Sequence, residues 1–227
     1  MRLFFAIVFK IVLYFLILSV IWVVVLKVVP VWVTPLMLVR KGEASAEGES
    51  TKLYHDWVSY ENISKEAALA VVSSEDQEFP NHWGFDFEQI QDAMSEKRKR
   101  PRGASTISQQ VAKNVFLWNG RSYIRKALEA YFTVLIELIW GKERILEVYL
   151  NVAETGKMTF GVEAAAQRFY GKPAKNLTRH EAARIAAVLP NPIRYSIKNP
   201  SSYVQGRTSK IARQMRALGG QKYIADL

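Results

Sequence analysis

A run of polar side chains over residues 104–114 holds the residues best suited to chemistry. It reads Ala-Ser-Thr-Ile-Ser-Gln-Gln-Val-Ala-Lys-Asn, with two glutamines, a lysine and an asparagine behind a Ser-Thr pair. Thr106 and Gln109 have capping-box spacing, which predicts that a helix begins here. Packing alone has no use for so many side-chain amides. Together with the upstream segment 75–86 (Glu-Asp-Gln-Glu-Phe-Pro-Asn-His-Trp-Gly-Phe-Asp), the run predicts a site that binds a polar, anionic substrate beside a carboxylate.

Glu75 is the first candidate for that carboxylate. It follows the apolar helical run 67–72, so it should lie at the edge of a packed element. Burial against Phe79 and Trp83 would raise its pKa towards neutrality, as a general base or acid requires. The alternative is a helix-end carboxylate held by a nearby Arg or Lys. His82 lies in the same turn, and its spacing from Asp76 and Asp86 favours structural hydrogen bonding over metal ligation.

Glu129 is the second candidate, because it lies in the most apolar helix of the domain. A charge there is costly unless it is paired, and Lys126 at i−3 offers a simple salt bridge as the alternative reading. Cations that flank the two carboxylates would suit a diphosphate whose leaving charge must be neutralised. A solvated basic face is the alternative for these residues, which are Lys113, Arg121, Arg125 and Lys126. The sequence has no glycine-rich phosphate loop.

Residues 97–102 (Lys-Arg-Lys-Arg-Pro-Arg) form the densest basic run. A nucleic-acid patch is one reading, but the run has no interleaved aromatic residues. A loop near anionic headgroups or substrate is favoured, and no nucleic-acid partner is expected. The chain as a whole carries a formal charge of +10 and no cysteine, which excludes disulfides and thiolate metal sites.

The elements that position these residues are predicted to be mainly α-helical, with few and short strands. The helix expected over 122–140 is apolar on almost every face and should therefore be buried. One domain is expected over residues 52–227, after a short small and acidic linker over 42–51. The other predicted helices cover residues 64–72, 87–94, 107–117, 143–151, 162–170, 178–189 and 203–218.

The N-terminal 41 residues are predicted to anchor the chain in a membrane. Residues 11–26 carry no charge, and extension to Leu3 with Lys10 snorkelling gives the ~20 residues of a spanning helix. A cleaved signal peptide, with residues 44–46 (Ala-Ser-Ala) as its site, is the alternative, but the apolar stretch is too long for it. Arg2 and Lys10 favour a cytoplasmic N-terminus. Lys27, Arg40 and Lys41 favour the opposite orientation. The apolar residues 28–39 would lie along the bilayer surface.

Five ordered motifs make the chain resemble the monofunctional biosynthetic peptidoglycan glycosyltransferases, which share their catalytic domain with class A penicillin-binding proteins. The resemblance spans residues 60–192. The motifs are Glu75-Asp76-x-x-Phe79-x-x-His82-x-Gly84-x-Asp86; Gly103-x-Ser105-Thr106-Ile107-x-Gln109-Gln110-x-x-Lys113-Asn114; Arg125-Lys126-x-x-Glu129; Lys142-x-Arg144-Ile145-Leu146-Glu147-x-Tyr149-Leu150-Asn151; and Gly161-Val162-x-x-Ala165-Ala166-x-x-Phe169-Tyr170-Gly171-Lys172. The chain departs from the family at Arg102-Gly103-Ala104, where a glycine pair is frequent.

The resemblance implies a lysozyme-like α-helical fold with a smaller, membrane-dipping lobe, and polymerisation of lipid II outside the cytoplasmic (inner) membrane. It implies that Glu75 is the general base. Glu129 would hold the diphosphate with the help of Lys113, Arg121, Arg125 and Lys126, directly or through a divalent cation (Mg or Mn). Gln110, Ser105 and Asn114 would shape the sugar and diphosphate site. Partners would be lipid II, the growing glycan strand, the bilayer and other cell-wall synthesis proteins.

Two rival functions are weighed against this one. A lytic peptidoglycan glycosidase on a similar scaffold would shorten glycan strands instead of lengthening them. A non-catalytic membrane-anchored scaffold would bind anionic partners through its positive surface, and its binding would weaken steeply with salt. The chain lacks Ser-x-x-Lys and Lys-Thr-Gly, so transpeptidase activity is not expected.

Overall fold

The computed structural model describes residues 1–95, 105–120 and 122–227, and within this part the chain is mainly helical. The predicted basic loop 97–102 and Arg121 lie outside the described residues. The helices are α1 (Arg2–Val28), α2 (Pro35–Ala46), α3 (Lys65–Glu75), α4 (Phe87–Ser95), α5 (Ile107–Phe116), α6 (Tyr123–Ile139), α7 (Lys142–Val152), α8 (Val162–Tyr170), α9 (Arg179–Val188) and α10 (Ser202–Ala217). Three single-turn 3₁₀ segments complete the helical part: Tyr60–Asn62, Ala174–Asn176 and Gly220–Ile224.

Local sequence signals set where these helices begin. The hydroxyls of Ser64, Ser122 and Ser201 accept hydrogen bonds from backbone N–H groups in the first turns of α3, α6 and α10. Both predicted capping boxes are confirmed, Thr106 with Gln109 at α5 and Thr178 with Glu181 at α9. The predicted helices are therefore present, with boundaries shifted by only a few residues.

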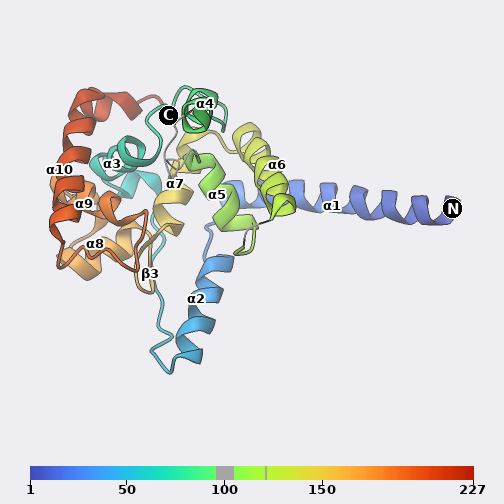
Figure 1. Cartoon of the computed structure of the whole chain (residues 1–227), viewed down its shortest axis with the longest axis horizontal. Helices are drawn as coiled ribbons and strands as arrows, with labels where there is room; N and C mark the ends of the chain where they lie inside the picture. Colours follow the sequence, from blue (N-terminus) through green and yellow to red (C-terminus); the bar gives the residue numbers. More distant parts are fainter. Residues whose placement is uncertain (96–104, 121) are drawn as a thin grey trace.

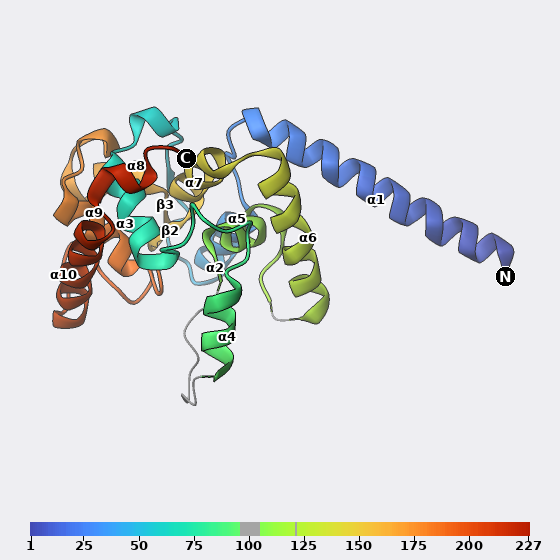
Figure 2. The same ribbon diagram turned by 90° about the horizontal axis from the view of Figure 1, so that it is seen from above.

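The helices of the catalytic region form two lobes on either side of α7 (Figure 1). The large lobe contains α3, α8, α9 and α10, and the small lobe contains α4, α5 and α6. Both α3 and α5 pack on α7, whose Ile145, Leu146 and Tyr149 are fully buried. Seen from above, α4 projects from the body (Figure 2), and Figure 1 shows α4 and α2 on opposite sides of the domain. This arrangement holds the C-terminus of α3 opposite the first turns of α5.

A small sheet follows the C-terminal end of α7. Its strands are β1 (Tyr54–His55), β2 (Glu154–Gly156) and β3 (Thr159–Phe160), in the order β1-β3-β2. β1 pairs with β3 in parallel, with Tyr54 opposite Thr159, and β2 pairs with β3 antiparallel. Gly161 follows with φ of +82°, and a Cβ there would lie 2.5 Å from the Asn151 carbonyl oxygen. Only glycine allows the chain to pass this close to α7 before α8 begins.

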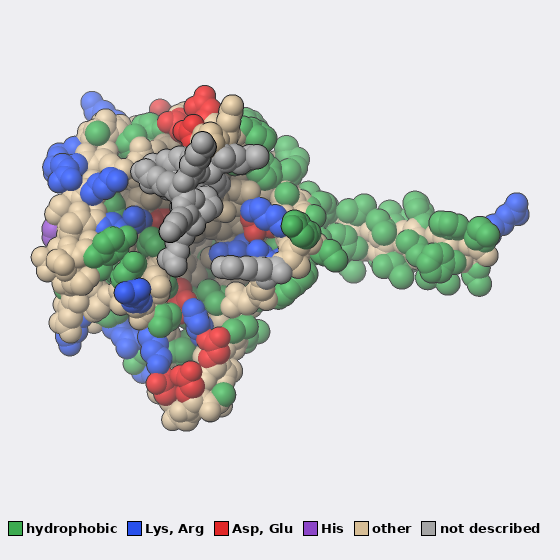
Figure 3. Space-filling model, viewed as in Figure 1, with side chains coloured by type: hydrophobic (Ala, Val, Ile, Leu, Met, Phe, Trp, Pro, Cys, Tyr) green, Lys and Arg blue, Asp and Glu red, His purple; other side chains and the backbone are tan. Residues whose placement is uncertain are grey.

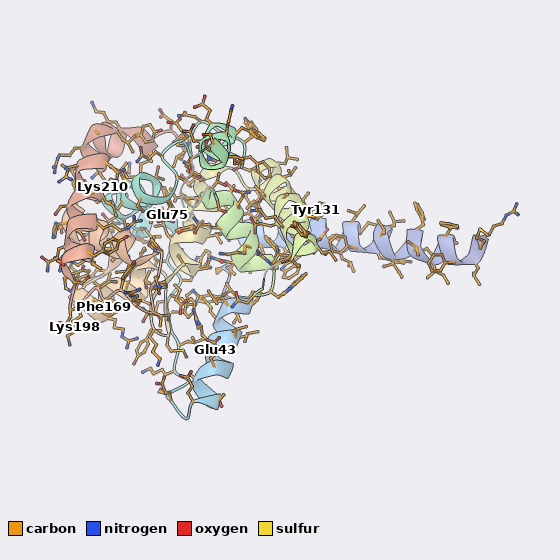
Figure 4. All side chains as sticks on the ribbon, viewed as in Figure 1. Glu43, Glu75, Tyr131, Phe169, Lys198 and Lys210 are labelled. Carbon is orange, nitrogen blue, oxygen red and sulfur yellow. The ribbon has the colours of Figure 1, made fainter. Side chains whose placement is uncertain are left out.

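Helix α1 leaves the body as an isolated apolar rod (Figures 1 and 3). It is the one helix in the described part that is long and apolar enough to cross a membrane, with a mean hydropathy of 2.8. Its C-terminal half packs against α6, where Ser19 Oγ lies 2.7 Å from the Tyr131 hydroxyl. Figure 4 labels Tyr131 at this junction. The anchor is therefore docked on the small lobe.

Two side chains fix the exit of α1 from this junction. The Trp140 indole N–H donates to the Val23 carbonyl at 2.7 Å. The Arg144 guanidinium donates to the carbonyls of Leu26 and Val29 at 2.8 and 2.7 Å, and so satisfies carbonyls at the helix end.

The expectation that the helix over 122–140 is buried on almost every face was wrong. Tyr123, Ile124 and Leu138 are exposed, whereas Phe132 and Ile136 are buried against α5 and its neighbours. The helix has one packed face, and its other apolar side chains lie outside that face. Apolar residues on every face can indicate a bilayer as well as a protein core.

The predicted linker over residues 42–51 is helical in its first half, because α2 extends to Ala46. This helix begins after Thr34, whose hydroxyl accepts from the Met37 N–H, and it packs against α5. Arg40 also forms a bidentate pair with Glu154 of β2, at 2.9 and 3.0 Å. The juxtamembrane segment is thus attached to the domain.

Candidate active site

Glu75 is the last residue of α3 and lines a cleft of about 990 Å³ between the two lobes. Its side chain is 15% exposed. Three weak contacts reach the carboxylate: the Gln110 Nε2–H donates to Oε2 at 3.3 Å, and Arg207 and Ser74 donate to Oε1 at 3.4 and 3.5 Å. Figure 4 labels Glu75 on α3 and Lys210 on the neighbouring α10, which lines the same cleft.

Burial raises the pKa of Glu75 above its ordinary value. The Gln110 hydrogen bond, the positive charge of Arg207 and the Ser74 hydroxyl lower the pKa and only partly offset the burial. The predicted direction of this shift is confirmed. The expectation that Glu75 is buried against Phe79 and Trp83 is only half correct, because Phe79 is fully buried but Trp83 is 75% exposed. The residues that close over Glu75 come from α5 and α10 instead.

The neighbouring Asp76 ties the end of α3 to the start of α5. Its carboxylate accepts the N–H of Ile107 at 2.9 Å and lies 2.9 and 3.1 Å from His82 Nε2. The Gly84 N–H donates to His82 Nδ1, so Nε2 carries the proton that Asp76 accepts. The structural role predicted for His82 is confirmed by these bonds. Asp86 likewise caps α4 by accepting the Gln89 N–H at 2.8 Å.

Helix α5 presents Gln110, Lys113 and Asn114 on one face, because they are three and four residues apart. Gln110 contacts Glu75. Lys113 lies one turn further on, between the two candidate carboxylates, and both Glu75 and Glu129 raise its pKa. Burial, together with the positive charges of Arg125 and Lys126, outweighs that effect, so the pKa of Lys113 is lowered overall. A cation whose charged form is destabilised in this way is suited to bind an anion.

Glu129 is buried on α6 and is held by two cations. The Lys126 ammonium pairs with Oε1, and Arg125 donates to Oε2 at 3.3 Å. The salt bridge weighed as the alternative reading of Glu129 is therefore present. Figure 3 shows Lys and Arg side chains gathered around a hollow in this face of the molecule.

The structure divides the predicted site residues between two places. Three of them line the cleft: Glu75, Ser105 and Gln110. Four others form or adjoin a cationic cluster at the junction of α5 and α6, defined here as Lys113, Arg125, Lys126 and Glu129. Asn114 is half-buried on the same face of α5. Arg121 is outside the described residues, so its place in either group stays a prediction.

A divalent cation finds no ready ligand set in the described part of the chain. No three His, Asp or Glu side chains there approach one another closely enough to hold a metal. Both oxygens of Glu129 are already engaged by Arg125 and Lys126. The described residues therefore do not fit a preassembled metal site, and the expected Mg²⁺ or Mn²⁺ stays a prediction.

The sequence reasoning missed the wall of the cleft that α10 supplies. Arg207, Lys210, Ile211 and Gln214 line it, at the i, i+3, i+4, i+7 spacing of one helix face. This stripe was visible in the sequence. It could not be distinguished from an ordinary solvated face, because other basic residues of α10, such as Arg213, point to solvent.

A half-buried carboxylate with a raised pKa in a long polar cleft is typical of enzymes that make or break glycosidic bonds. Comparison with known proteins narrows this class. The profile of one family, described as Transglycosylase, matches residues 41–216. The chain belongs to this transglycosylase family.

Individual relatives are similar in sequence to this chain over most of its length. A biosynthetic peptidoglycan transglycosylase of Pseudomonas putida is 53% identical over 211 residues, which cover 92% of this chain and 89% of the relative. Proteins of the same name from Chromohalobacter salexigens and Escherichia coli are 52% and 51% identical, over 92% of this chain and 91% and 89% of their own.

Proposed function

We propose that Glu75 is the general base of a reaction that polymerises lipid II into linear glycan strands. As a transglycosylase, the chain is an enzyme of cell-wall synthesis that makes peptidoglycan glycan strands. One observation carries the assignment of the base: Glu75 lines the cleft, and burial raises its pKa while no residue of the described part forms a strong ion pair with it. A carboxylate whose pKa is raised in this way is a better proton acceptor than an ordinary glutamate.

The reaction needs one proton transfer and one displacement. Glu75 takes the proton from the 4-hydroxyl of the acceptor N-acetylglucosamine as that oxygen attacks C1 of the donor N-acetylmuramic acid. The bond from C1 to the diphosphate breaks, undecaprenyl diphosphate leaves, and the α-linkage is inverted to β-1,4. Gln110 and Ser105 beside Glu75 would contact the sugars, with Asn114 further along α5.

The cationic cluster would bind the diphosphate. Charge builds on the leaving diphosphate in the transition state, so cations positioned beforehand lower the barrier. Lys113 is the central member because it interacts with both carboxylates and because Arg125 and Lys126 destabilise its charged form. A bound anion would relieve that repulsion. Arg121 would join this group, and Glu129 would hold Arg125 and Lys126 in place.

We further propose a single-pass arrangement in the cytoplasmic (inner) membrane, with the catalytic domain on the outer, periplasmic face. The apolar length of α1 and its docking on α6 support an anchor that keeps the small lobe at the bilayer, where a lipid-linked substrate is found. Arg2 and Lys10 near the N-terminus support a cytoplasmic start. The chain should lengthen glycan strands and not cross-link them.

The test uses purified full-length protein in detergent with labelled lipid II and Mg²⁺, beside the Glu75→Gln variant. We expect a ladder of long glycan products from the wild type and none from the variant. Shortening of preformed glycan, without extension, would support a lytic glycosidase. Lipid II binding without product in either protein would support a scaffold. A ladder from both would leave polymerisation intact and remove Glu75 as the base.

A further inference from the structure

Tyr149 is a buried phenol of α7 with no role in the reaction as described so far. Its side chain is 2% exposed and lies where the two lobes meet. Within the described part of the chain, its hydroxyl has one hydrogen-bond partner, the Gln110 Oε1 at 3.2 Å. Burial and the nearby charges of Glu75 and Asp76 raise the pKa of Tyr149 well above its usual value. The hydroxyl therefore keeps its proton and remains a donor.

The Gln110 side chain connects this phenol to Glu75. Its Oε1 accepts from Tyr149, and its Nε2 donates to Glu75 Oε2 at 3.3 Å and to the Ser105 carbonyl at 3.4 Å. The contacts with Glu75 and Ser105 thus fix one orientation of the amide, and the Tyr149 O–H matches that orientation.

The reversed amide would place its oxygen against two acceptors and would leave one donor without an acceptor. Oε1 would face the Glu75 carboxylate and the Ser105 carbonyl, where two acceptors meet. The Tyr149 O–H would lose its acceptor and become a buried, unsatisfied donor. The contact with Glu75 weakens once Glu75 takes up a proton, because a protonated carboxyl can itself donate to Oε1, whereas the Ser105 carbonyl stays an acceptor. The Tyr149 contact does not depend on the state of Glu75.

We propose that Tyr149 is a positioning residue of the catalytic base, whose hydroxyl orients the Gln110 amide so that an N–H always faces Glu75. This proposal rests on the proposed role of Glu75. It assigns to Tyr149 the task of holding the amide in this orientation while Glu75 carries the proton, so that the N–H is in place when Glu75 releases that proton to solvent.

Other charged groups also face Glu75 and must be held constant in any test. They are Asp76 beside it on the chain, Arg207 of α10 and Lys113 of α5. Tyr149→Phe changes none of them and keeps the aromatic ring in the core. A change in the pH dependence of this variant can then be attributed to the hydrogen bond that it removes.

The experiment measures initial rates of lipid II polymerisation against pH for wild type, Tyr149→Phe, Gln110→Ala and the double variant. For Tyr149→Phe we expect kcat to fall by roughly 3- to 10-fold, the effect of one neutral hydrogen bond, with KM within about twofold. The acid limb of the kcat profile should move to higher pH, because Glu75 loses part of the donor that lowers its pKa. In the Gln110→Ala background, removal of the hydroxyl should have no further effect.

Tyr170→Phe is the matched control, because the Tyr170 hydroxyl is buried and has no hydrogen-bond partner within the described residues. It should leave the rate and the pH profile unchanged. An equal loss from Tyr149→Phe with and without the Gln110 amide would overturn the proposal in favour of a packing role. A wild-type profile for Tyr149→Phe would overturn it as well.

If Tyr149→Phe does not fold, 3-fluorotyrosine at position 149 retains the ring and strengthens the O–H donor. The acid limb should then move to lower pH, and an unmoved limb would contradict the proposal. A product ladder from Glu75→Gln would refute the base itself, so the two failures are distinguishable.

Discussion

Glu75 and Glu129 are both largely buried glutamates on helices that border the site, yet their surroundings differ. Among the described residues, the Glu75 carboxylate receives three contacts of 3.3–3.5 Å, of which only Arg207 brings a charge. The Glu129 carboxylate is paired at one oxygen with Lys126 and at the other with Arg125. The first keeps lone pairs that can accept a proton. The second is a counterion whose oxygens are already engaged.

The difference shows how one short stretch of chain can supply both a base and an anion-binding region. Lys113 lies between the two glutamates on α5 and responds to both. Strong pairing of Glu75 would lower its pKa and weaken it as a base, whereas weak pairing of Glu129 would leave Arg125 misplaced in a buried position. Each glutamate suits its proposed task because it lacks the environment of the other.

The largest expected effect separates the two glutamates by activity and by stability. Glu75→Gln should lower kcat by ~10²–10⁴-fold, the usual contribution of a general base, with no loss of stability. Glu129→Gln should instead lower the free energy of unfolding by roughly 1–3 kcal/mol, because the 13%-exposed Arg125 loses its counter-charge. Lys126 adds little to this loss, since it is 53% exposed.

Polymerisation rates and urea unfolding of both variants in the same detergent would measure this separation. Glu129→Asp, which keeps the charge, is the control and should recover most of the stability. A Glu75→Gln variant that unfolds more readily than Glu129→Gln would invert the comparison, because Glu75 would then be the structural counterion.

The next effect concerns Arg207, the one charged side chain that contacts Glu75 from the large lobe. Its charge lowers the pKa of Glu75, so Arg207→Gln should raise that pKa further. Activity below the new pKa should then fall several-fold while the plateau at higher pH changes less. The rate measured from pH 5 to 9 would show the shift of the acid limb.

Arg213→Gln is the control for Arg207→Gln, because Arg213 lies on the exposed side of the same helix. It alters the net charge equally and should leave the limb in place. If both variants shift the limb alike, the pKa of Glu75 responds to overall charge and not to the contact with Arg207.

The sequence predicted the helices well, and it predicted the position of Glu75 at a helix end, because both depend on local signals. Capping boxes and apolar spacing are read within a few residues, and Glu75 follows directly from the end of an apolar helix. The wall that α10 provides was not predictable, since Arg207 is 132 residues from Glu75 and meets it only through the packing of α3, α9 and α10. The same limit applies to Tyr149, whose hydroxyl reaches Gln110 across 39 residues.

The burial of α6 was predicted wrongly for a related reason. Its apolar residues were read as core, but composition does not say whether an apolar face meets protein or lipid. Tyr131 contacts the anchor helix, whereas Leu138 on the same helix is exposed. The two surroundings can be told apart only in the structure, where α1 contacts Tyr131 and leaves Leu138 exposed.

The smallest expected effect is the pH dependence of stability, and it has opposite signs at two glutamates. Glu75 has a raised folded pKa, so the folded chain binds its proton more tightly than the unfolded chain does. Wild type therefore loses stability at this site as the pH rises from the ordinary glutamate pKa of 4.5 through the raised value. Glu75→Gln avoids that loss, so its advantage over wild type should be absent at low pH and grow across this window.

Glu66 provides the opposite case, because its hydrogen bond with Arg179 lowers its pKa. Its contribution is present above pH 4.5 and disappears as the pH falls through the lowered value, so Glu66→Gln should be less stable than wild type at neutral pH and converge with it in acid. Urea midpoints at pH 3, 4, 5, 6 and 7 would measure both trends. Parallel curves for the two variants would mean that Glu75 is paired in solution as strongly as Glu66, and the contrast with Glu129 would then disappear.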